Sequence, residues 1–278
     1  MSSILTNSSA MVALATLKNV NMKLNETQNR VSTGLQIQSA KDNAAYFAIS
    51  ETMKGDSGMY EAINDGLTST KNSIATARLG AETVSDLAQQ FSERVAFAQG
   101  SGVNLIDVQA ELDSIVSQIG NAISQATFNG GSLVTGAATQ TIVSGVTRSG
   151  GTFAASTLTF SSVDLGAIQT ALDAVDVVTA SATSQAALQA ALVTAEGQLS
   201  AAISAATSLG VSEKTIEGQQ TFLSSLTDTI DSGVSAMVDA DMEAEAARLQ
   251  ALQVQQQLST QSLSMANQAP QNIMSLFR

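Results

Sequence analysis

The residues that could do chemistry in this chain are mainly carboxylates, because histidine and cysteine are absent. The chain therefore lacks the usual proton-transfer group, thiol nucleophiles and common zinc or iron–sulfur ligands. The densest acidic cluster is Asp239-Ala-Asp-Met-Glu-Ala-Glu245. A calcium-binding EF-hand loop starting there would need Gly and Glu where the chain has Ala244 and Gln250. We predict no metal site and no cofactor, and interpret these acids as the start of a helix, whose N-terminus attracts negative charge.

Catalysis and N-glycosylation have little support in the remaining motifs. An enzyme would need clustered carboxylates or a Ser/Lys pair in a cleft, and no such motif occurs, so we predict that the chain is not an enzyme. Asn7-Ser-Ser and Asn25-Glu-Thr match the N-glycosylation pattern. Both fall where we expect buried coiled coil, so we interpret them as chance matches. O-linked modification of the middle segment stays open.

Charge and hydropathy exclude several kinds of partner. The formal net charge of −12 argues against nucleic acid and anionic membrane surfaces, which select Lys and Arg clusters. No stretch approaches the roughly 18 apolar residues of a membrane span. The first residues, MSSILTNSSA, lack the basic segment and long apolar run of a secretory signal peptide. If the protein leaves the cell, another route must carry it.

Long helices are the main elements that the sequence predicts. Apolar residues recur at steps of three and four from about 43 to 98, 105 to 126 and 188 to 237, the spacing of coiled-coil packing. Glu213, Gln220 and Thr227 interrupt the third stripe, where we expect looser or wetter packing. The packing residues predicted from the stripes are Ile63, Leu67, Ile74, Val84, Phe91, Leu112, Ile119, Leu223 and Ile230.

The middle of the chain changes character. Between 132 and about 164, Gly, Ser and Thr dominate and charges nearly vanish. QTIVSGV and STLTFSSV have the composition of strands and are separated by Ser149-Gly-Gly151. We predict a small β-hairpin followed by a short helix near 165–175. The fold class is mainly α: a long-helix coiled-coil bundle with this hairpin and with paired termini.

The two chain ends carry complementary patterns. Residues 1–41 carry four basic residues and one acid, a net +3, and residues 239–278 carry four acids and two basic residues, a net −2. Single amphipathic helices need a partner for stability, so the ends either fold back onto one bundle or cover each other and neighbouring subunits. The residues predicted for the second arrangement are Leu14, Leu17, Val20, Leu24, Val31, Met242, Leu249, Leu252, Leu258, Leu263, Leu276 and Phe277.

A short interruption separates the first helix from the second. Gly34 can adopt the left-handed conformation that ends a helix. Leu35 and Ile37 then lie on one side of an extended segment, and Ser39 or Asp42 can cap the next helix. We interpret Gly34, Leu35, Ile37, Ser39 and Asp42 as a connector joint.

Both ends of the chain resemble the bacterial flagellins. RVSTGLQIQSAKDNAAYFAIS at 30–50 is similar to the N-terminal signature of that family. DADMEAEAARLQALQVQQQL at 239–258, SLSMAN at 262–267 and LFR at the end are similar to its C-terminal run, and FNG at 128–130 also fits. The resemblance covers roughly residues 1–130 and 185–278.

The resemblance implies a structural subunit of the flagellar filament. It assigns 1–41 and 239–278 to an inner terminal coiled coil, 42–130 and 185–238 to an outer helical bundle, and 131–184 to a variable outward segment. It further implies extracellular export without a cleaved signal and polymerisation of the chain with itself into a helical tube. Expected partners are the flagellar cap, hook-associated proteins and an export chaperone at the C-terminal helix.

Two departures and two alternatives qualify the resemblance. The Arg-rich stretch that an innate immune receptor recognises in many flagellins is poorly matched at Leu87–Val95, so we expect weak receptor activation. Leu209-Gly210 is followed by Val-Ser-Glu-Lys, not by the family's usual Asn-Arg, so contacts of that Arg do not transfer. A hook–filament junction protein shares similar ends, although two prolines typical of its joint are missing here. A secreted coiled-coil adhesin would not need both terminal signatures.

Overall fold

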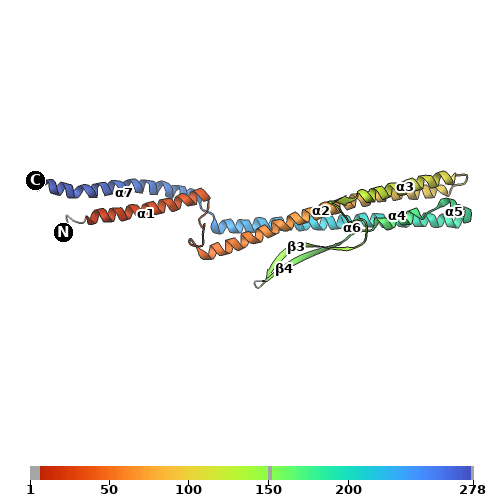
Figure 1. Ribbon diagram of the computed structural model, residues 1–278, viewed down its shortest axis with the longest axis horizontal. Helices are drawn as coiled ribbons and strands as arrows, with labels where there is room; N and C mark the ends of the chain where they lie inside the picture. The colour runs from red at the N-terminus through yellow and green to blue at the C-terminus, as the bar shows by residue number, and fades with distance from the viewer. Residues whose placement is uncertain (1–6, 150–151, 277–278) are drawn as a thin grey trace. The chain divides into compact units, whose positions relative to one another are not determined.

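Helices form most of the protein, which divides into two compact units (Figure 1). The computed structural model describes residues 7–149 and 152–276, with side chains described there except at 149, 153 and 269–276. The terminal unit contains the described residues up to Asp56 and those from Thr229 onward. The bundle unit is Ser57–Asp228. The long helices α2 (Ala44–Ala98) and α6 (Gln185–Val238) contribute to both units.

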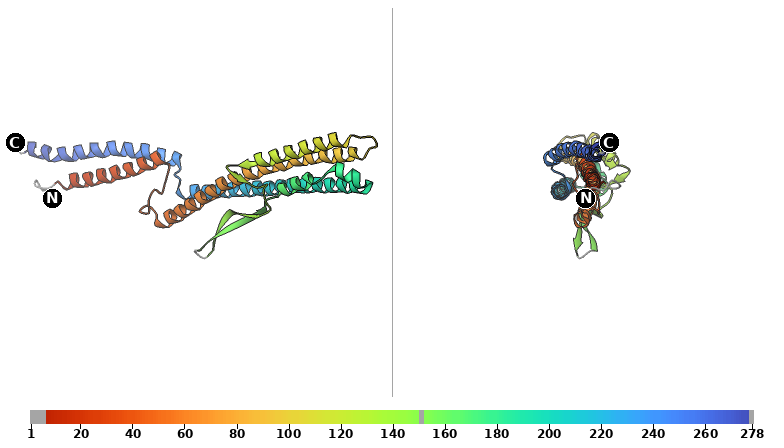
Figure 2. Two further views of the ribbon diagram at one scale, coloured as in Figure 1. Left: turned by 45° about the vertical axis from the view of Figure 1, so that its right-hand side comes forward. Right: turned by 90° about the vertical axis from the view of Figure 1, so that its left-hand side faces the viewer.

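In the terminal unit, α1 (Ser8–Thr33) lies beside α7 (Met242–Leu276), as both views of Figure 2 show. The Asn7 side chain accepts the Ala10 N–H and so caps the first turn of α1. At the other end, Gly34 has φ +74° and donates its N–H to the Arg30 carbonyl. This left-handed conformation ends the helix. Because α1 and α7 lie side by side, the predicted pairing of the chain ends is confirmed.

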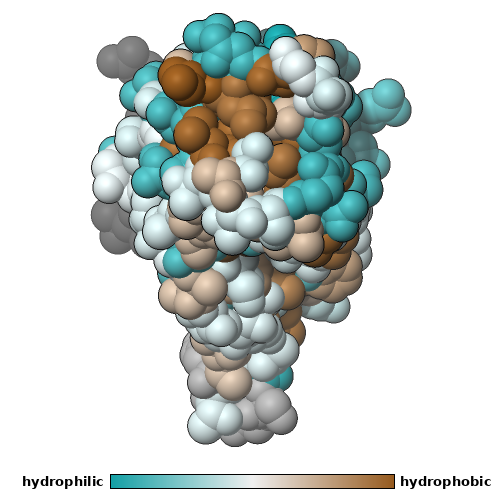
Figure 3. Space-filling model, turned by 90° about the vertical axis from the view of Figure 1, so that its right-hand side faces the viewer, coloured by the Kyte–Doolittle hydropathy of each residue, from teal (hydrophilic) through white to brown (hydrophobic). Residues whose placement is uncertain are grey.

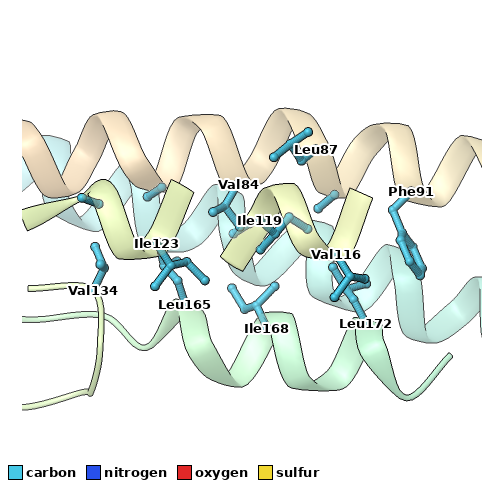
Figure 4. Packing of buried hydrophobic residues seen from close by; sticks show 14 of the residues in the cluster. Val84, Leu87, Phe91, Val116, Ile119, Ile123, Val134, Leu165, Ile168 and Leu172 are labelled. Carbon is cyan, nitrogen blue, oxygen red and sulfur yellow. The ribbon is translucent and has the colours of Figure 1, made fainter. Parts of the chain in front are cut away.

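The bundle unit packs α3 (Leu105–Gln125), α4 (Leu165–Asp173) and α5 (Val177–Thr183) with the long helices α2 and α6. Asn104, Asp164 and Asp176 each accept backbone N–H groups of the helix that they precede, so short polar residues set three helix starts. Figure 4 shows apolar side chains of α2, α3 and α4 meeting in one layer, with Val84, Ile119 and Ile168 among them.

Seven of the predicted packing residues are almost fully buried in the bundle unit. Their exposed fractions are between 0% and 1%: Leu67, Ile74, Val84, Phe91, Leu112, Ile119 and Leu223. Ile63 is half-buried against the same cluster. Ile230 instead packs in the terminal unit, against a small cluster that contains Ile37, Val234 and Val238.

Polar residues on the stripe of α6 make specific contacts with α2. Arg78 Nε donates to Glu213 Oε2 at 2.8 Å, and Gln220 Nε2 donates to Thr68 Oγ1 at 2.7 Å. The Arg78 hydrogen bond to Glu213, followed by that to Glu82, raises the pKa of Arg78. Two of the three polar interruptions of the apolar stripe, Glu213 and Gln220, are thus paired with polar groups of α2.

Two small antiparallel hairpins connect α3 to α4. The first joins β1 (Thr127–Phe128) to β2 (Gly131–Ser132) through Asn129 and Gly130, which have φ +49° and +78°. Positive φ at both central residues is the geometry of a type I′ turn, for which Asn-Gly is favoured. The second joins β3 (Thr139–Ser149) to β4 (Thr152–Ser161).

The predicted fold class is confirmed, with two additions. The hairpin and short helix of the middle segment are present as β3, β4 and α4. The sequence interpretation missed α5 and the short β1–β2 hairpin that Asn129 and Gly130 close.

Candidate assembly surface

The pairing of α1 with α7 combines an apolar seam with polar contacts. Val20 and Leu252 are buried, with exposed fractions of 8% and 6%. Other predicted assembly residues are half-buried along the two helices: Leu17, Leu24, Val31, Leu249 and Leu263. This seam removes one face of each helix from water, which stabilises the pair.

Polar contacts fix an antiparallel register along the seam. Asn7 Nδ2 donates to the Ala266 carbonyl at 2.7 Å, and Gln256 Nε2 donates to Asn21 Oδ1 at 2.7 Å. The triple glutamine run that dilutes the apolar pattern of α7 thus supplies one seam contact, and only Gln256 of the three is half-buried.

The carboxylate of Glu245 is the most buried charge of the terminal unit's described residues. Glu245 is 8% exposed, and its Oε1 accepts from Arg30 Nη1 at 3.4 Å and Arg248 Nη1 at 3.1 Å. Its Oε2 is buried without a hydrogen-bond donor among the described residues. A buried carboxylate is costly unless it is paired, so Arg30 and Glu245 together tie α1 to the first turns of α7.

The acidic residues around the start of α7 cap and complement the N-terminus of that helix. Asp241 Oδ1 accepts the N–H groups of Glu243 and Ala244 at 3.0 and 3.1 Å. Glu243 and Glu245 lie in the first turn, where carboxylates are favoured. The interpretation of these acids as the start of a helix is therefore confirmed for Asp241, Glu243 and Glu245. Within the described ranges, no three acidic, His or Cys residues lie where they could hold a metal ion.

The outward faces of both helices carry large apolar side chains. Leu14 and Met242, both predicted for the interface, are 43% and 44% exposed, and Leu258 is 60% exposed. Leu276 and Phe277 were also predicted, but the side chain of the first and all of the second lie outside the described residues.

Sequence reasoning missed further exposed apolar residues on these faces. Their exposed fractions lie between 55% and 67%: Met11, Val12, Met22 and Val254. Met265, which the sequence pattern already placed on the C-terminal apolar stripe, is 61% exposed. On α7, Val254, Leu258 and Met265 follow helical spacing on a second stripe that avoids the seam. Because a helix with two apolar stripes has a second face to cover, that spacing was the signal that could have identified them.

The connector joint pairs with the break between α6 and α7. Gln36 and Ile37 donate their N–H groups to the Val238 carbonyl at 2.7 and 3.2 Å. Ala240 N–H donates to the Gly34 carbonyl at 2.8 Å. Leu35 and Ile37 both pack against the small cluster around Val238, so they share one side of the segment as expected.

A turn centred on Asp42 closes the joint. Its Oδ2 accepts the N–H groups of Gln38 and Ser39 and the Ser39 hydroxyl, at 3.0 to 3.1 Å. The bond from the Gln38 N–H, followed by that from the Ser39 side chain, lowers the pKa of Asp42. The prediction that Ser39 or Asp42 caps the next helix is wrong: Asn43 Oδ1 accepts the N–H groups of Ala45 and Tyr46. Asp42 is instead committed to the turn before it.

A groove lies beside the joint within the terminal unit. It has a volume of about 680 Å³, and its walls come from the second half of α1 and from the joint. The lining residues include Met22, Arg30, Ile37 and Lys41. Side chains of both charges line the groove, Glu26 and Asp42 with Arg30 and Lys41.

The bundle unit also presents an apolar patch. Figure 3 shows it at the end that carries the α2–α3 connection and α5, ringed by hydrophilic residues. Exposed apolar side chains of these elements are Phe97 at 57%, Ile106 at 70% and Val178 at 37%. None of the described helices combines the length and hydropathy of a transmembrane segment.

Comparison with known proteins assigns the family. The bacterial flagellin N-terminal helical region matches residues 4–139, and the flagellin C-terminal helical region matches residues 192–277. The chain is 40% identical over 281 residues to a flagellin of Brucella melitensis, covering 100% of both chains. It is 36% identical to Flagellin FljM of Caulobacter vibrioides, covering 100% of this chain and 99% of that one.

A solved structure shares the fold. A putative flagellar hook-associated protein from Vibrio parahaemolyticus aligns with a TM-score of 0.52 and 15% identity, covering 71% of this chain and 100% of that one. Since both terminal regions match the family and full-length relatives reach 40% identity, the chain belongs to the bacterial flagellins, a family of structural proteins of the flagellum.

Proposed function

We propose that this chain is a non-catalytic subunit that polymerises with itself into the extracellular flagellar filament. The observation that carries the proposal is the terminal unit, in which a paired α1 and α7 still expose large apolar side chains such as Met11, Leu258 and Met265. Burial of apolar surface drives association, and contacts between unlike faces of identical copies extend into an open helical polymer.

The layered arrangement follows from the same proposal. The terminal helices, 1–41 with 239–278, form the inner layer, and 42–130 with 185–238 form the outer layer. The segment 131–184 faces outward. Gly34, Leu35, Ile37, Ser39 and Asp42 act as the joint between the layers. The chain is exported unfolded without a cleaved signal, with a chaperone on the C-terminal helix, and meets the cap and hook-associated proteins during growth.

Seeded elongation tests polymerisation. Purified full chain is mixed with short filament seeds, and lengths are measured by negative-stain microscopy. Leu258→Asp places a charge on the second, exposed stripe of α7, which contains Val254, Leu258 and Met265, and should slow elongation at least tenfold. Gln255→Asp is the matched control, because it adds the same charge at an exposed position of α7 off both stripes. A chain lacking 239–278 should not elongate.

The outcomes separate the alternatives. Equal elongation by Leu258→Asp and Gln255→Asp would show that the second stripe of α7 is not part of the assembly interface. Failure of the full chain on competent seeds would favour a hook–filament junction protein. Weak innate-receptor activation is a further expectation, based on Leu87–Val95, and a strong response in a reporter-cell assay would contradict it.

A further inference from the structure

The β3–β4 hairpin is a ribbon of two strands beside the long helices of the bundle unit (Figures 1 and 2). An isolated two-stranded hairpin is marginally stable in water. Its apolar support is limited: Phe160 is 8% exposed, while Ile142 and Leu158 are half-buried against the core. Contacts with the helices must therefore supply much of its stability.

A bulge in β3 frees one carbonyl for such a contact. The register moves from Val143 opposite Thr157 to Gly145 opposite Ser156, so Ser144 has no cross-strand partner. A bulged residue leaves the ladder locally disrupted. The Ser144 carbonyl accepts Gln219 Nε2 at 2.8 Å, and Ser144 itself is 9% exposed. Gln219 on α6 thus satisfies a group that the strand pairing leaves free.

A second contact comes from the other long helix. The Tyr60 hydroxyl on α2 donates to the Val146 carbonyl at 3.0 Å. Gln219 on α6 and Tyr60 on α2 therefore bind carbonyls of the same strand, at Ser144 and Val146. The base of the hairpin is held separately, by backbone bonds such as Ser162 N–H to the Ala138 carbonyl at 2.9 Å.

We propose that Gln219 and Tyr60 form a latch that seats the hairpin on α2 and α6, and that the hairpin opens as a unit separate from the helices. With the hairpin seated, Leu67, Ile216 and Leu223 of α2 and α6 are 0% to 1% exposed and lie in one cluster with residues of α3 and α4, so we expect the helices to keep a core of their own when the hairpin leaves. The latch goes beyond filament formation and does not depend on it.

Hydrogen exchange of the full chain, read by mass spectrometry, tests the latch. Gln219→Met keeps the side-chain length and removes the amide donor, and Tyr60→Phe removes only the hydroxyl. Each should accelerate exchange of the β3 and β4 amides about fivefold, the ratio expected for one net hydrogen bond. The double variant should give more than tenfold, while α2 and α6 keep their protection.

Two variants with the same chemical changes at positions that do not contact the hairpin serve as matched controls. Gln220→Met removes an amide that donates to Thr68 on α2 and not to the hairpin, and Tyr46→Phe removes an exposed hydroxyl of the terminal unit. Both should leave hairpin exchange unchanged. Unchanged exchange in the double variant would overturn the latch. Simultaneous loss of protection in β3, β4, α2 and α6 would overturn the separate opening.

The chain offers an optical check that does not rely on exchange. It has two tyrosines and no tryptophan, so Tyr46→Phe leaves Tyr60 as the only aromatic emitter of consequence. Adding Gln219→Met to that background should increase quenching of Tyr60 by acrylamide, because an opened hairpin uncovers the ring. Equal quenching with and without Gln219 would contradict the proposal.

Discussion

The two units share the same helical spacing of apolar residues but differ in how far their apolar stripes are covered. In the bundle unit, Ile74 and Phe91 on the α2 stripe are 0% exposed, because α3, α4 and α6 cover it. In the terminal unit, one seam between α1 and α7 is covered, while Leu258 and Met265 stay 60% and 61% exposed. The α2 stripe is therefore covered within its own unit, although Phe97 and Ile106 elsewhere on that unit are 57% and 70% exposed, whereas the second stripe of α7 is not covered by the described residues of the terminal unit. That contrast connects the fold to the proposed polymer.

The largest expected effect comes from emptying the bundle core. Phe91→Ala removes a fully buried ring and should lower the free energy of unfolding of the bundle unit by about 3–5 kcal/mol. Urea denaturation followed by circular dichroism measures the loss. Leu258→Ala, on an exposed site of the terminal unit, should change monomer stability by less than about 0.5 kcal/mol. Similar losses for both variants would erase the distinction between the units.

Close packing within the bundle unit predicts the next effect. A Cβ added at Gly80 would lie 2.5 Å from the Ala126 Cβ. Gly80→Ala should therefore destabilise the unit by about 1–3 kcal/mol, even though Ala favours helix. At Gly66 a Cβ meets nothing within 4 Å, so Gly66→Ala should stabilise by up to about 1 kcal/mol. Urea denaturation measures the stability of both variants. Equal stability of Gly80→Ala and Gly66→Ala would contradict the close packing of Gly80 against Ala126.

The connector joint predicts an effect confined to the terminal unit. Gly34 has φ +74°, so Gly34→Ala should destabilise the end of α1 by about 1 kcal/mol. Hydrogen exchange of the last turn of α1 measures it. Gly55→Ala, a helical site of the same unit with nothing within 4 Å of the added Cβ, should not accelerate that exchange. A change in the bundle unit would show that the effect is not local.

The smallest expected effect is the pH response of the Asp42 turn. Hydrogen bonds from Gln38 and Ser39 lower the folded-state pKa below the ordinary value of 3.8. The turn is therefore stabilised at pH values above about 4 and loses that stabilisation as the pH falls through the lowered pKa. Asp42→Asn should remove this part of the acid dependence. Exchange of the Gln38 and Ser39 amides between neutral and acid pH reports it, and an identical profile in both proteins would refute it.

Individual residues show which structural features could be predicted from the sequence and which could not. The steps of three and four identified Leu67, Leu112 and Leu223 as packing positions because their spacing is local and repeats. Gly34 marked the end of α1 for the same reason, since its conformation depends on the residue itself. The N-cap of α2 was misassigned because Ser39, Asp42 and Asn43 are all capable of capping, and only the fold of the turn decides between them.

Local spacing and residue type were enough to specify the long helices, their apolar stripes, the interruption at Gly34 and the hairpin in the middle. The tertiary structure was needed to decide which stripes are covered. Leu252 is buried while Leu258, six residues later, is exposed, because α7 meets α1 along one face only. It also decided that Gln219 reaches the freed carbonyl of Ser144, a contact that no spacing along the chain could indicate.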